Sequence, residues 1–530
     1  MGSMTARDRF FSKFNGSSLL LFLSLLILSS SGLADDGSRL KSLKDFQEKA
    51  ERFNLVLEVP DFDTTPEELK ESYAAAIAEA NAALDRIANQ DLSQVTFEST
   101  VKALDDAAYL AGIEASRIYL LMNTSENAQL RDVAQELINQ FDSWSVEVDY
   151  REDLYRVIKV FAESQHPQLS GEDQRLFEET LRGYERLGFH LPPEERERLK
   201  ELKKKLNDLE TLIQTNIRNG KAILEFSAEE LAGVPENILE TLRSKEDGDK
   251  YQVAAHVSWQ YSAVMQNASR EETRKRLSLT RNQLTKEENR GPRPVAALVG
   301  NFEPPAEGRP SLMQHEQAET LFHEFGHVLH DLLTTAKYHA FSGTNVPRDF
   351  VEAPSQIFER WVWNKRVLDT FALHYQDPSK TIPQDLLEAM ERARIGTVAT
   401  GYRGQIAFGL LDMEIHTHLP ADPYAVTNEI LSRVYFPFPE ETAFLARFGH
   451  LFGGYDAGYY GYAWSDAIAA DLASIFEGAE NGFLDQGVGA RLRKEIFEVG
   501  NSRDVNESIR LFLQREPSQE AFLKYIGVKR

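Results

Sequence analysis

The chain has 530 residues, of which 42% are hydrophobic and 27% charged, a composition typical of a globular protein with more than one domain-sized core. Its formal net charge of −24 argues against nucleic acid and anionic lipid surfaces as partners. The chain contains no cysteine, which excludes disulfide bonds and leaves histidine and carboxylate as the ligands for any zinc.

The N-terminus has the order of a secretory signal peptide. Arg7, Arg9 and Lys13 form a basic start, residues 19–28 are almost wholly apolar, and small residues lead up to Ala34. The apolar stretch is too short for comfortable membrane crossing. We therefore expect cleavage after Ala34, export to the periplasm or the medium, and no stable membrane association of the mature chain. An uncleaved anchor is the alternative.

Helical patterns dominate from about residue 42 to residue 284. Thr65 is expected to cap a helix, with Pro66 at its first position and Glu68 completing a capping box. Residues 192–220 predict a long helix that stops at a glycine. Its apolar positions follow steps of three and four, which predicts a seam against a neighbouring helix; they are Leu199, Leu202, Leu206, Leu209 and Ile213.

The pattern changes near residue 286. Residues 286–311 contain five prolines and three glycines, and within them residues 295–302 (VAALVGNF) read as one buried strand. Helical periodicity resumes at Glu316 and is interrupted by a segment rich in glycine and tyrosine at residues 449–464. The sequence thus predicts a mostly α protein with a small sheet, divided into domains 35–290 and 291–530 after the 1–34 leader.

The run ETLFHEFGHVLHDLL contains two histidines that bracket a glutamate. On a helix, His323 and His327 lie on one face, where both imidazoles can reach one ion. Zinc accepts imidazole nitrogen and keeps an open position for water in catalytic sites. Glu324 points beside such a metal rather than at it, so it can take a proton from water and pass it to a leaving amine.

Chance is a poor explanation of this motif. With 12 histidines and 83 acidic residues, a random chain contains roughly 0.04 such matches even if every acid counts as glutamate. Apolar residues surround the motif, and buried histidines and glutamates are unfavourable without a binding partner. The alternative is a helix that merely carries surface histidines.

Three residues are candidates for a third metal ligand. Glu352 lies 25 residues after His327, which is enough for one helix to end and a second to return. We expect Asp349 to cap that second helix and Glu352 to lie in its first turn. Glu359 shares the same helix face, and His330 follows His327 by three residues, so both have suitable spacing.

Several longer segments surround the motif. VAALVGNFEPP and PSLMQHEQAETL precede FHEFGHVLH, and FSGTNVPRDFVEAPSQ, GYRGQIAFGLLD and FGHLFGGYDAGYYGYAWSD follow it. Together they resemble the M3 metallopeptidases, the group of thimet oligopeptidase, oligopeptidase A and dipeptidyl carboxypeptidase. The resemblance implies two helical lobes around a deep cleft, with a small active-site sheet and a zincin-type helix.

The resemblance also implies roles for individual residues. His323, His327 and Glu352 match the ligands of one zinc ion, and Glu324 matches the general base. Four further residues match family residues that touch the substrate or stabilise the negative oxygen that develops on the carbonyl under attack; they are His450, Tyr455, Tyr459 and Tyr462. The glycines of this segment would let it close over peptide, and a phenol is most effective where water is excluded. Packing is the alternative for these tyrosines, and the one we favour for Tyr460.

Two polar residues near these motifs have open roles. Glu319 lies four residues before His323 and either accepts the second ring N–H of that histidine or faces solvent. Asn345 stands where many M3 members have another polar residue or histidine.

The chain departs from the family in one respect. M3 members normally carry a substantial segment before the VAALV strand, whereas here RKRLSLTRNQLTKEENRGPRPVAAL leads into it almost directly. Its loss would leave the zinc helix intact, open the channel and leave strand 295–302 as an exposed edge.

The sequence and this resemblance therefore predict an exported zinc oligopeptidase that hydrolyses short peptides, and the resemblance implies that it is a monomer. A dipeptidyl carboxypeptidase is a variant of the same chemistry. A zinc-bound remnant that binds peptide without cleaving it is the alternative from a different class.

Overall fold

The computed structural model describes residues 62–164, 169–219, 223–244, 250–254, 310–418, 420–437, 444–445, 448–451 and 454–529, with isolated positions between 260 and 302. The leader lies outside the described residues. So does most of the predicted strand 295–302, of which residues 296–298 and 302 are described without strand structure. Within the described part of the chain, no helix is long and apolar enough to cross a membrane.

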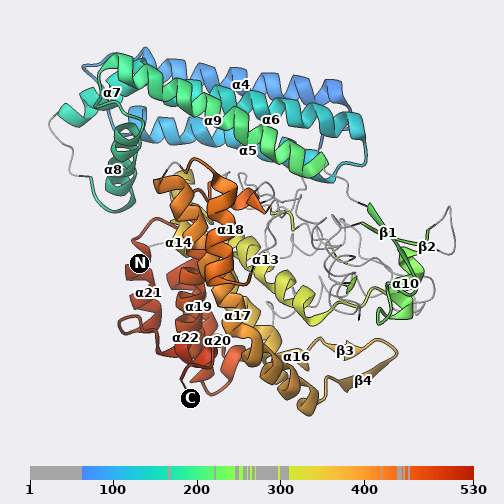
Figure 1. Cartoon of the computed structure of the whole chain (residues 1–530). Helices are drawn as coiled ribbons and strands as arrows, with labels where there is room; N and C mark the ends of the chain where they lie inside the picture. Colours follow the sequence, from blue (N-terminus) through green and yellow to red (C-terminus); the bar gives the residue numbers. More distant parts are fainter. Residues whose placement is uncertain are drawn as a thin grey trace.

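Residues 62–219 form a helical lobe, drawn in blue to green across the top of Figure 1. Its helices are α4 (Pro66–Ala88), η1 (Glu98–Lys102), α5 (Ala103–Thr124), α6 (Ala128–Asp149), α7 (Glu152–Glu163), α8 (Gly171–Arg186) and α9 (Pro193–Asn219). The capping box predicted at Thr65 and Glu68 is confirmed, with Pro66 at the first helical position. Apolar faces of α4, α5 and α6 pack together around Leu69 and Ile118.

The seam predicted for α9 is wrong. Leu202, Leu206 and Leu209 are 55%, 47% and 47% exposed. The helix is held to α6 by another face, where Lys200 and Lys204 both pair with Glu147. Periodicity therefore identified the helix correctly but not the face that its neighbours cover. The predicted stop at residue 220 lies outside the described residues.

A small antiparallel sheet follows α9, in a part of the chain where a mostly helical pattern was expected. Strand β1 (Ile223–Ser227) pairs with β2 (Lys250–Ala254), with Phe226 opposite Tyr251. Helix α10 (Glu236–Leu242) packs beside them, and one apolar cluster joins all three elements. Two strands of five residues carry too little pattern to stand out in a helical sequence.

Residues 310–529 form a second, mostly helical lobe below the first (Figure 1). Its first part comprises α13 (His315–Leu333), η2 (His339–Phe341), α14 (Arg348–Val351), α15 (Ala353–Glu359), η3 (Arg360–Trp363), α16 (Lys365–Leu368) and the two-stranded sheet of β3 (Leu373–His374) and β4 (Asp377–Thr381). Its second part comprises α17 (Gln384–Thr417), α18 (Pro423–Val434), η5 (Gly449–Leu451), α19 (Gly461–Glu477), η6 (Gly482–Leu484), α20 (Gln486–Leu492), η7 (Arg493–Phe497), α21 (Val505–Leu513) and α22 (Glu520–Tyr525). The mostly α fold class is confirmed.

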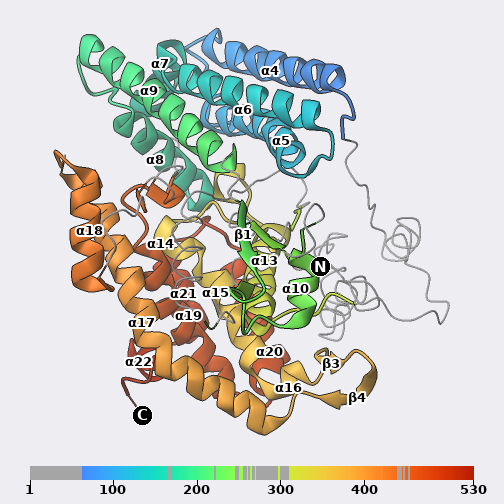
Figure 2. The same ribbon diagram turned by 45° about the vertical axis from the view of Figure 1, so that its right-hand side comes forward.

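The core of this lobe lies between α13, α15 and α19. Phe322 and Phe325 of α13, Ile357 of α15 and Leu472 and Phe476 of α19 are all buried in it. Figure 2 shows α17 running along the outside of these helices. This core places α13, which carries the two histidines, directly against α15.

The two lobes share one hydrophobic core at their junction. Tyr338 and Phe341, which follow α13, are buried with Phe97 and Phe161 of the N-terminal lobe. On α8, the Arg175 guanidinium donates to Asn501 in the C-terminal lobe. The chain near residue 340 therefore packs with the first lobe, although it lies well inside the second in sequence.

Candidate metal centre

The packing of α13 on α15 depends on a glycine. A Cβ atom at Gly326 would lie 2.5 Å from Cα of Ser355 and 3.1 Å from the carbonyl oxygen of Pro354, so only glycine allows this approach. Gly326 lies between the two motif histidines, and Ser355 lies three residues after Glu352. The contact therefore brings the carboxylate of one helix to the imidazoles of the other.

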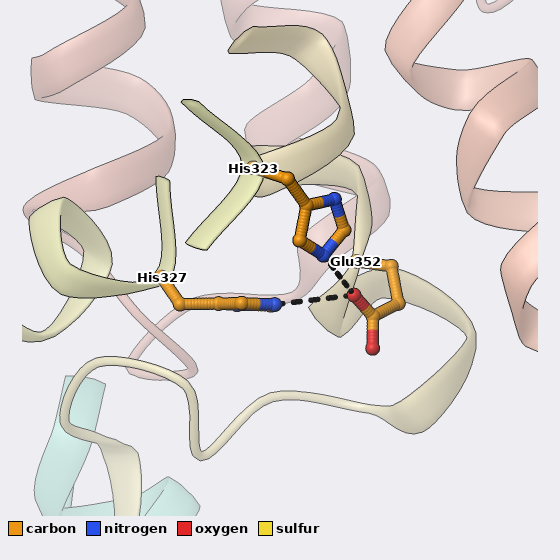
Figure 3. A group of neighbouring side chains, drawn as sticks. All are labelled: His323, His327 and Glu352. Carbon is orange, nitrogen blue, oxygen red and sulfur yellow. Dashed lines mark hydrogen bonds and ion pairs between the residues drawn. The ribbon is translucent and has the colours of Figure 1, made fainter. Parts of the chain in front are cut away.

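Figure 3 shows the three side chains that meet there. Nε2 of His323 and Nε2 of His327 each lie 3.2 Å from Oε2 of Glu352. Among the described residues, these are the group whose ligand atoms converge, all within 4.8 Å of one another. The Glu352 side chain is only 4% exposed, and the histidines are 19% and 13% exposed. The sequence-predicted trio is thus brought together.

The electrostatics of the trio favour positive charge at its centre. Burial alone would lower the pKa of His323, but Glu352 and Glu359 outweigh it and raise that pKa to about 10. Burial would raise the pKa of Glu352, yet the two imidazoles hold it well below its usual range. Two neutral imidazoles and one carboxylate are a donor set that zinc accepts. The residues present fit a divalent cation.

Glu359 contacts the His323 ring at the nitrogen that does not face Glu352. Its Oε1 is 2.8 Å from Nδ1 of His323, while Nε2 faces Glu352. A proton on Nδ1, donated to Glu359, leaves the Nε2 lone pair for a metal. Glu359 therefore contacts the His323 ring from outside the trio rather than replacing Glu352 within it. By contrast, Nδ1 of His327 is buried and has no hydrogen-bond partner among the described residues.

His330 and Glu319 lie apart from the converging group. His330, a candidate third ligand by its spacing, is fully buried and packs edge-on against Phe497. Glu319 accepts a hydrogen bond from the Trp363 indole rather than from a ligand histidine. His330 therefore does not take the place of Glu352 in the trio, and Glu319 does not take the place of Glu359 at Nδ1 of His323.

The predicted N-cap at Asp349 is wrong. Helix α14 starts after Pro347, and Glu352 stands at the junction of α14 and α15 instead of inside a first turn. Pro347 takes the position before α14, and no side-chain hydrogen bond caps the helix. Proline suits the start of a helix because its φ is fixed and it has no N–H to satisfy. The displaced start still leaves the Glu352 carboxylate on the side that faces α13.

Glu324 is adjacent to His323 on α13 and is half-buried. It is not one of the three converging ligands. It therefore stands next to a histidine of the trio without belonging to the trio.

The four residues singled out in the tyrosine-rich segment form one aromatic cluster. The His450 ring lies 5.7, 5.4 and 5.7 Å from the rings of Tyr455, Tyr459 and Tyr462. Tyr455 and Tyr462 stack at 5.2 Å. The Tyr455 hydroxyl donates to Oε1 of Glu352 at 2.5 Å, which ties the cluster to the metal centre. Tyr460, expected to pack, is instead 44% exposed and donates to Asp349.

Burial raises the pKa of both Tyr459 and Tyr462, and the Glu352 carboxylate adds to the rise in each case. Both phenols therefore keep their protons at neutral pH and can donate hydrogen bonds. The carbonyl of Tyr462 accepts a hydrogen bond from the buried Gln356 amide on α15, at 3.2 Å. The cluster is held against α15, which begins immediately after Glu352.

Two neighbours of the site were not predicted from the sequence. Gln356 and Asp412 both contact the backbone of the tyrosine-rich segment. Gln356 follows Glu352 by four residues, so helix periodicity could have placed it on the same face. Nothing in the local sequence around Asp412 indicates a contact 45 residues away.

Comparisons with known proteins show which family the chain resembles. The model of peptidase family M3 matches residues 199–528, more than half of the chain. Over 241 residues the chain is 44% identical to a thimet-like oligopeptidase of Dictyostelium discoideum, covering 44% of this chain and 35% of that protein. Oligopeptidase A of Escherichia coli is 37% identical over 244 residues, covering 45% and 35%.

A dipeptidyl carboxypeptidase of Salmonella typhimurium is 36% identical over 248 residues, covering 45% of this chain and 36% of that protein. In each case the match spans about a third of the relative's length. With the family model matched across the whole second lobe and the His-Glu-x-x-His helix in place, this chain belongs to peptidase family M3.

Proposed function

We propose that the chain is a zinc-dependent oligopeptidase that hydrolyses peptide bonds in short peptides. The observation that carries this proposal is the convergence of His323, His327 and Glu352, with Glu324 beside them. Family membership supports a peptidase, and three matched relatives carry the names of peptidases. His323, His327 and Glu352 would hold one zinc ion per chain.

When bound, zinc would polarise the scissile carbonyl and make water more acidic. In this proposal Glu324 accepts the proton of the attacking water and delivers it to the leaving amine, so that an acid and a base are supplied by one carboxylate. Glu359 holds the His323 ring in the tautomer that presents Nε2.

The tyrosine cluster supplies the remaining part of the chemistry. A negative oxygen develops on the carbonyl as water attacks, and a preorganised phenol is effective there because it needs no reorientation. Tyr459 and Tyr462 keep their protons and are the donors proposed for that oxygen. The Tyr455 hydroxyl is engaged with Glu352, so its proposed role is to orient that ligand, with His450 packed beside all three rings.

The test is cleavage of a quenched-fluorescent peptide by protein of known zinc content, compared with the Glu324→Gln variant. We expect wild-type turnover and a loss of more than about a hundredfold in kcat for the variant with zinc retained, because general acid–base catalysis contributes about 10²–10⁴-fold. Zinc-loaded wild type that cleaves no peptide in a mixed pool would contradict the proposal and favour a peptide-binding remnant.

Mass-spectrometric mapping of the products would separate two forms of the activity. Internal cuts are expected for an oligopeptidase, and successive release of C-terminal dipeptides would assign the dipeptidyl carboxypeptidase variant. We also propose that the chain is exported, from the order of the leader. N-terminal sequencing of protein from an expressing cell is expected to start at Asp35, and an intact Met1 in exported protein would contradict cleavage.

A further inference from the structure

Asp412 is a fully buried carboxylate on α17 that lies outside the metal centre. Its Oδ1 accepts a hydrogen bond from the backbone N–H of Ala457 at 3.0 Å, and its Oδ2 accepts one from the N–H of Tyr459 at 2.9 Å. Nδ1 of His416, one helical turn on, lies 2.9 Å from Oδ1. A buried acid with three such neighbours is satisfied, and it joins α17 to a segment 45 residues away.

The segment that Asp412 holds is a tight turn. The N–H of Gly458 donates to the carbonyl of Tyr455 at 2.8 Å, and Ala457 at the tip has a φ of +54°. A non-glycine residue in this left-handed region is strained by roughly 1–2 kcal/mol. One of the two hydrogen bonds to Asp412 comes from Ala457 itself and the other from Tyr459, two residues on, and together they stabilise the strained conformation.

The other side of the same turn reaches the metal centre. Tyr455 begins the turn, donates to Glu352 and stacks on Tyr462. Tyr459 leaves the turn and is 7% exposed among Phe408, Phe444 and Phe448. Of the two backbone positions that Asp412 fixes, one is Tyr459 itself and the other, Ala457, lies two residues after Tyr455. Moving the turn by about one ångström would move the phenols relative to Glu352.

We propose that Asp412 is a positioning residue for peptide hydrolysis. It holds the turn at residues 455–460 and thereby keeps the tyrosines of that turn in place at the metal centre. The inference rests on the proposed function for its chemical consequence. Its structural part, the anchoring of the turn, stands on the contacts alone. Asp412 does not touch the reacting atoms. It acts through Tyr455 and Tyr459 of the turn and, because Tyr455 stacks on Tyr462, through Tyr462 at the start of α19.

The substitution that tests this is Asp412→Asn. It preserves volume but places an amide NH₂ where one backbone N–H now finds an acceptor, so that one hydrogen bond is lost and two donors face each other. The matched control is Glu414→Gln, on the same helix, whose carboxylate pairs with the largely exposed His418 and not with the turn.

The first readout is amide hydrogen exchange, which needs no activity. In Asp412→Asn we expect the amides of Ala457 and Tyr459 to exchange at least about tenfold faster, because the loss of a buried hydrogen bond lowers the free energy of local opening. Residues in α13 and α15 should exchange as in wild type, as should the turn in Glu414→Gln. Unchanged exchange of the turn in Asp412→Asn would overturn the anchoring.

The second readout is a double-mutant cycle of Asp412→Asn with Tyr462→Phe, measured on peptide cleavage. We expect kcat to fall at least about tenfold in Asp412→Asn with KM little changed, since the lost interaction is made in the transition state. Once the phenol is removed, Asp412→Asn should have a much smaller effect, because the two residues act as one unit. Effects that simply multiply would overturn the positioning role.

The two proposals fail in different ways. If zinc-loaded wild type cleaves no peptide, the proposed function fails, and hydrogen exchange still decides whether Asp412 anchors the turn. If wild type cleaves peptide and Glu324→Gln does not, but Asp412→Asn behaves as Glu414→Gln does, the proposed function stands and the inference about Asp412 is wrong.

Discussion

The His323 ring is held between two carboxylates, and each carboxylate reaches a different nitrogen. Glu359 lies 2.8 Å from Nδ1, and Glu352 lies 3.2 Å from Nε2. Sequence spacing could show that both acids share a helix face, but it could not show which nitrogen each would reach. That distinction depends on how α15 crosses α13. It separates the residue that would bind the metal from the one that would orient its ligand.

Replacing Glu359 by glutamine removes the charge that fixes this tautomer. We expect zinc affinity to fall about 10–100-fold in Glu359→Gln, because outer partners of ligand histidines typically contribute that much. Competition with a chromophoric chelator measures the affinity. Glu316→Gln is the control, because Glu316 is exposed on α13, the helix of His323; this variant should bind zinc as wild type does. Equal affinities for the two variants would argue against an orienting role.

A second residue-scale effect lies in the N-terminal lobe, away from the metal centre. Burial raises the pKa of Asp142 to about 6, and the Glu210 carboxylate adds to the rise. The folded state therefore binds the proton of Asp142 more tightly than the unfolded chain does, in which the pKa of this group has its ordinary value of 3.8. The contribution of Asp142 to the free energy of unfolding is fully present at a pH below 3.8, the pKa of the group in the unfolded chain. This contribution is lost as the pH rises through about 6, its pKa in the folded state.

Asp142→Asn keeps the side chain neutral at every pH. We expect it to raise the free energy of unfolding by about 1–2 kcal/mol near pH 8, and by much less near pH 4, as measured by urea denaturation. Asp132→Asn, an exposed acid on the same helix, should show little difference between the two conditions. An Asp142→Asn variant that is less stable than wild type near pH 8 would contradict the assignment.

At the scale of elements, the approach of α13 to α15 decides whether a metal centre exists. Alanine is normally favoured over glycine inside a helix by about 1 kcal/mol. At Gly326 a Cβ would meet the backbone of Ser355, so the preference should reverse. The contact is one that sequence could not predict, because the glycine of the motif reads simply as a helical residue of low propensity.

We expect Gly326→Ala to lower the free energy of unfolding by about 1–3 kcal/mol, as overpacked contacts do. Zinc affinity should fall with it, because α15 must move away and carry Glu352 with it. Gly396→Ala on α17, where a Cβ meets nothing within 4 Å, is the matched control. It should be neutral or stabilising by up to about 1 kcal/mol. A Gly326→Ala protein as stable as this control would show that the helices are not in such contact.

Sequence patterns predicted elements better than they predicted contacts between them. The capped start of α4, the long α9 and the histidine helix α13 all follow from local propensity and periodicity. The exposed face of α9 and the sheet of β1 and β2 do not. Burial of a stripe requires a partner helix elsewhere in the chain, and a five-residue strand is decided by its pairing.

At the scale of the whole molecule, the two lobes are joined by contacts between side chains that lie on opposite sides of the predicted domain boundary near residue 290. Tyr338 and Phe341 belong to the second lobe in sequence and to the first in packing. Asp105 on α5 accepts hydrogen bonds from the N–H groups of His339 and Ala340, both at 2.9 Å. The segment after α13 is therefore tied to the N-terminal lobe, and the helix that carries the histidines is supported by both lobes.

The central claim is that two imidazoles of α13 and one carboxylate from the α14–α15 junction bind a single divalent cation. Equilibrium dialysis of zinc against wild type and Glu352→Gln tests it most directly, with circular dichroism to show that both are folded. The account predicts one tightly bound zinc per wild-type chain and a large loss of affinity in Glu352→Gln. A folded Glu352→Gln protein that still binds one zinc as tightly as wild type would contradict it.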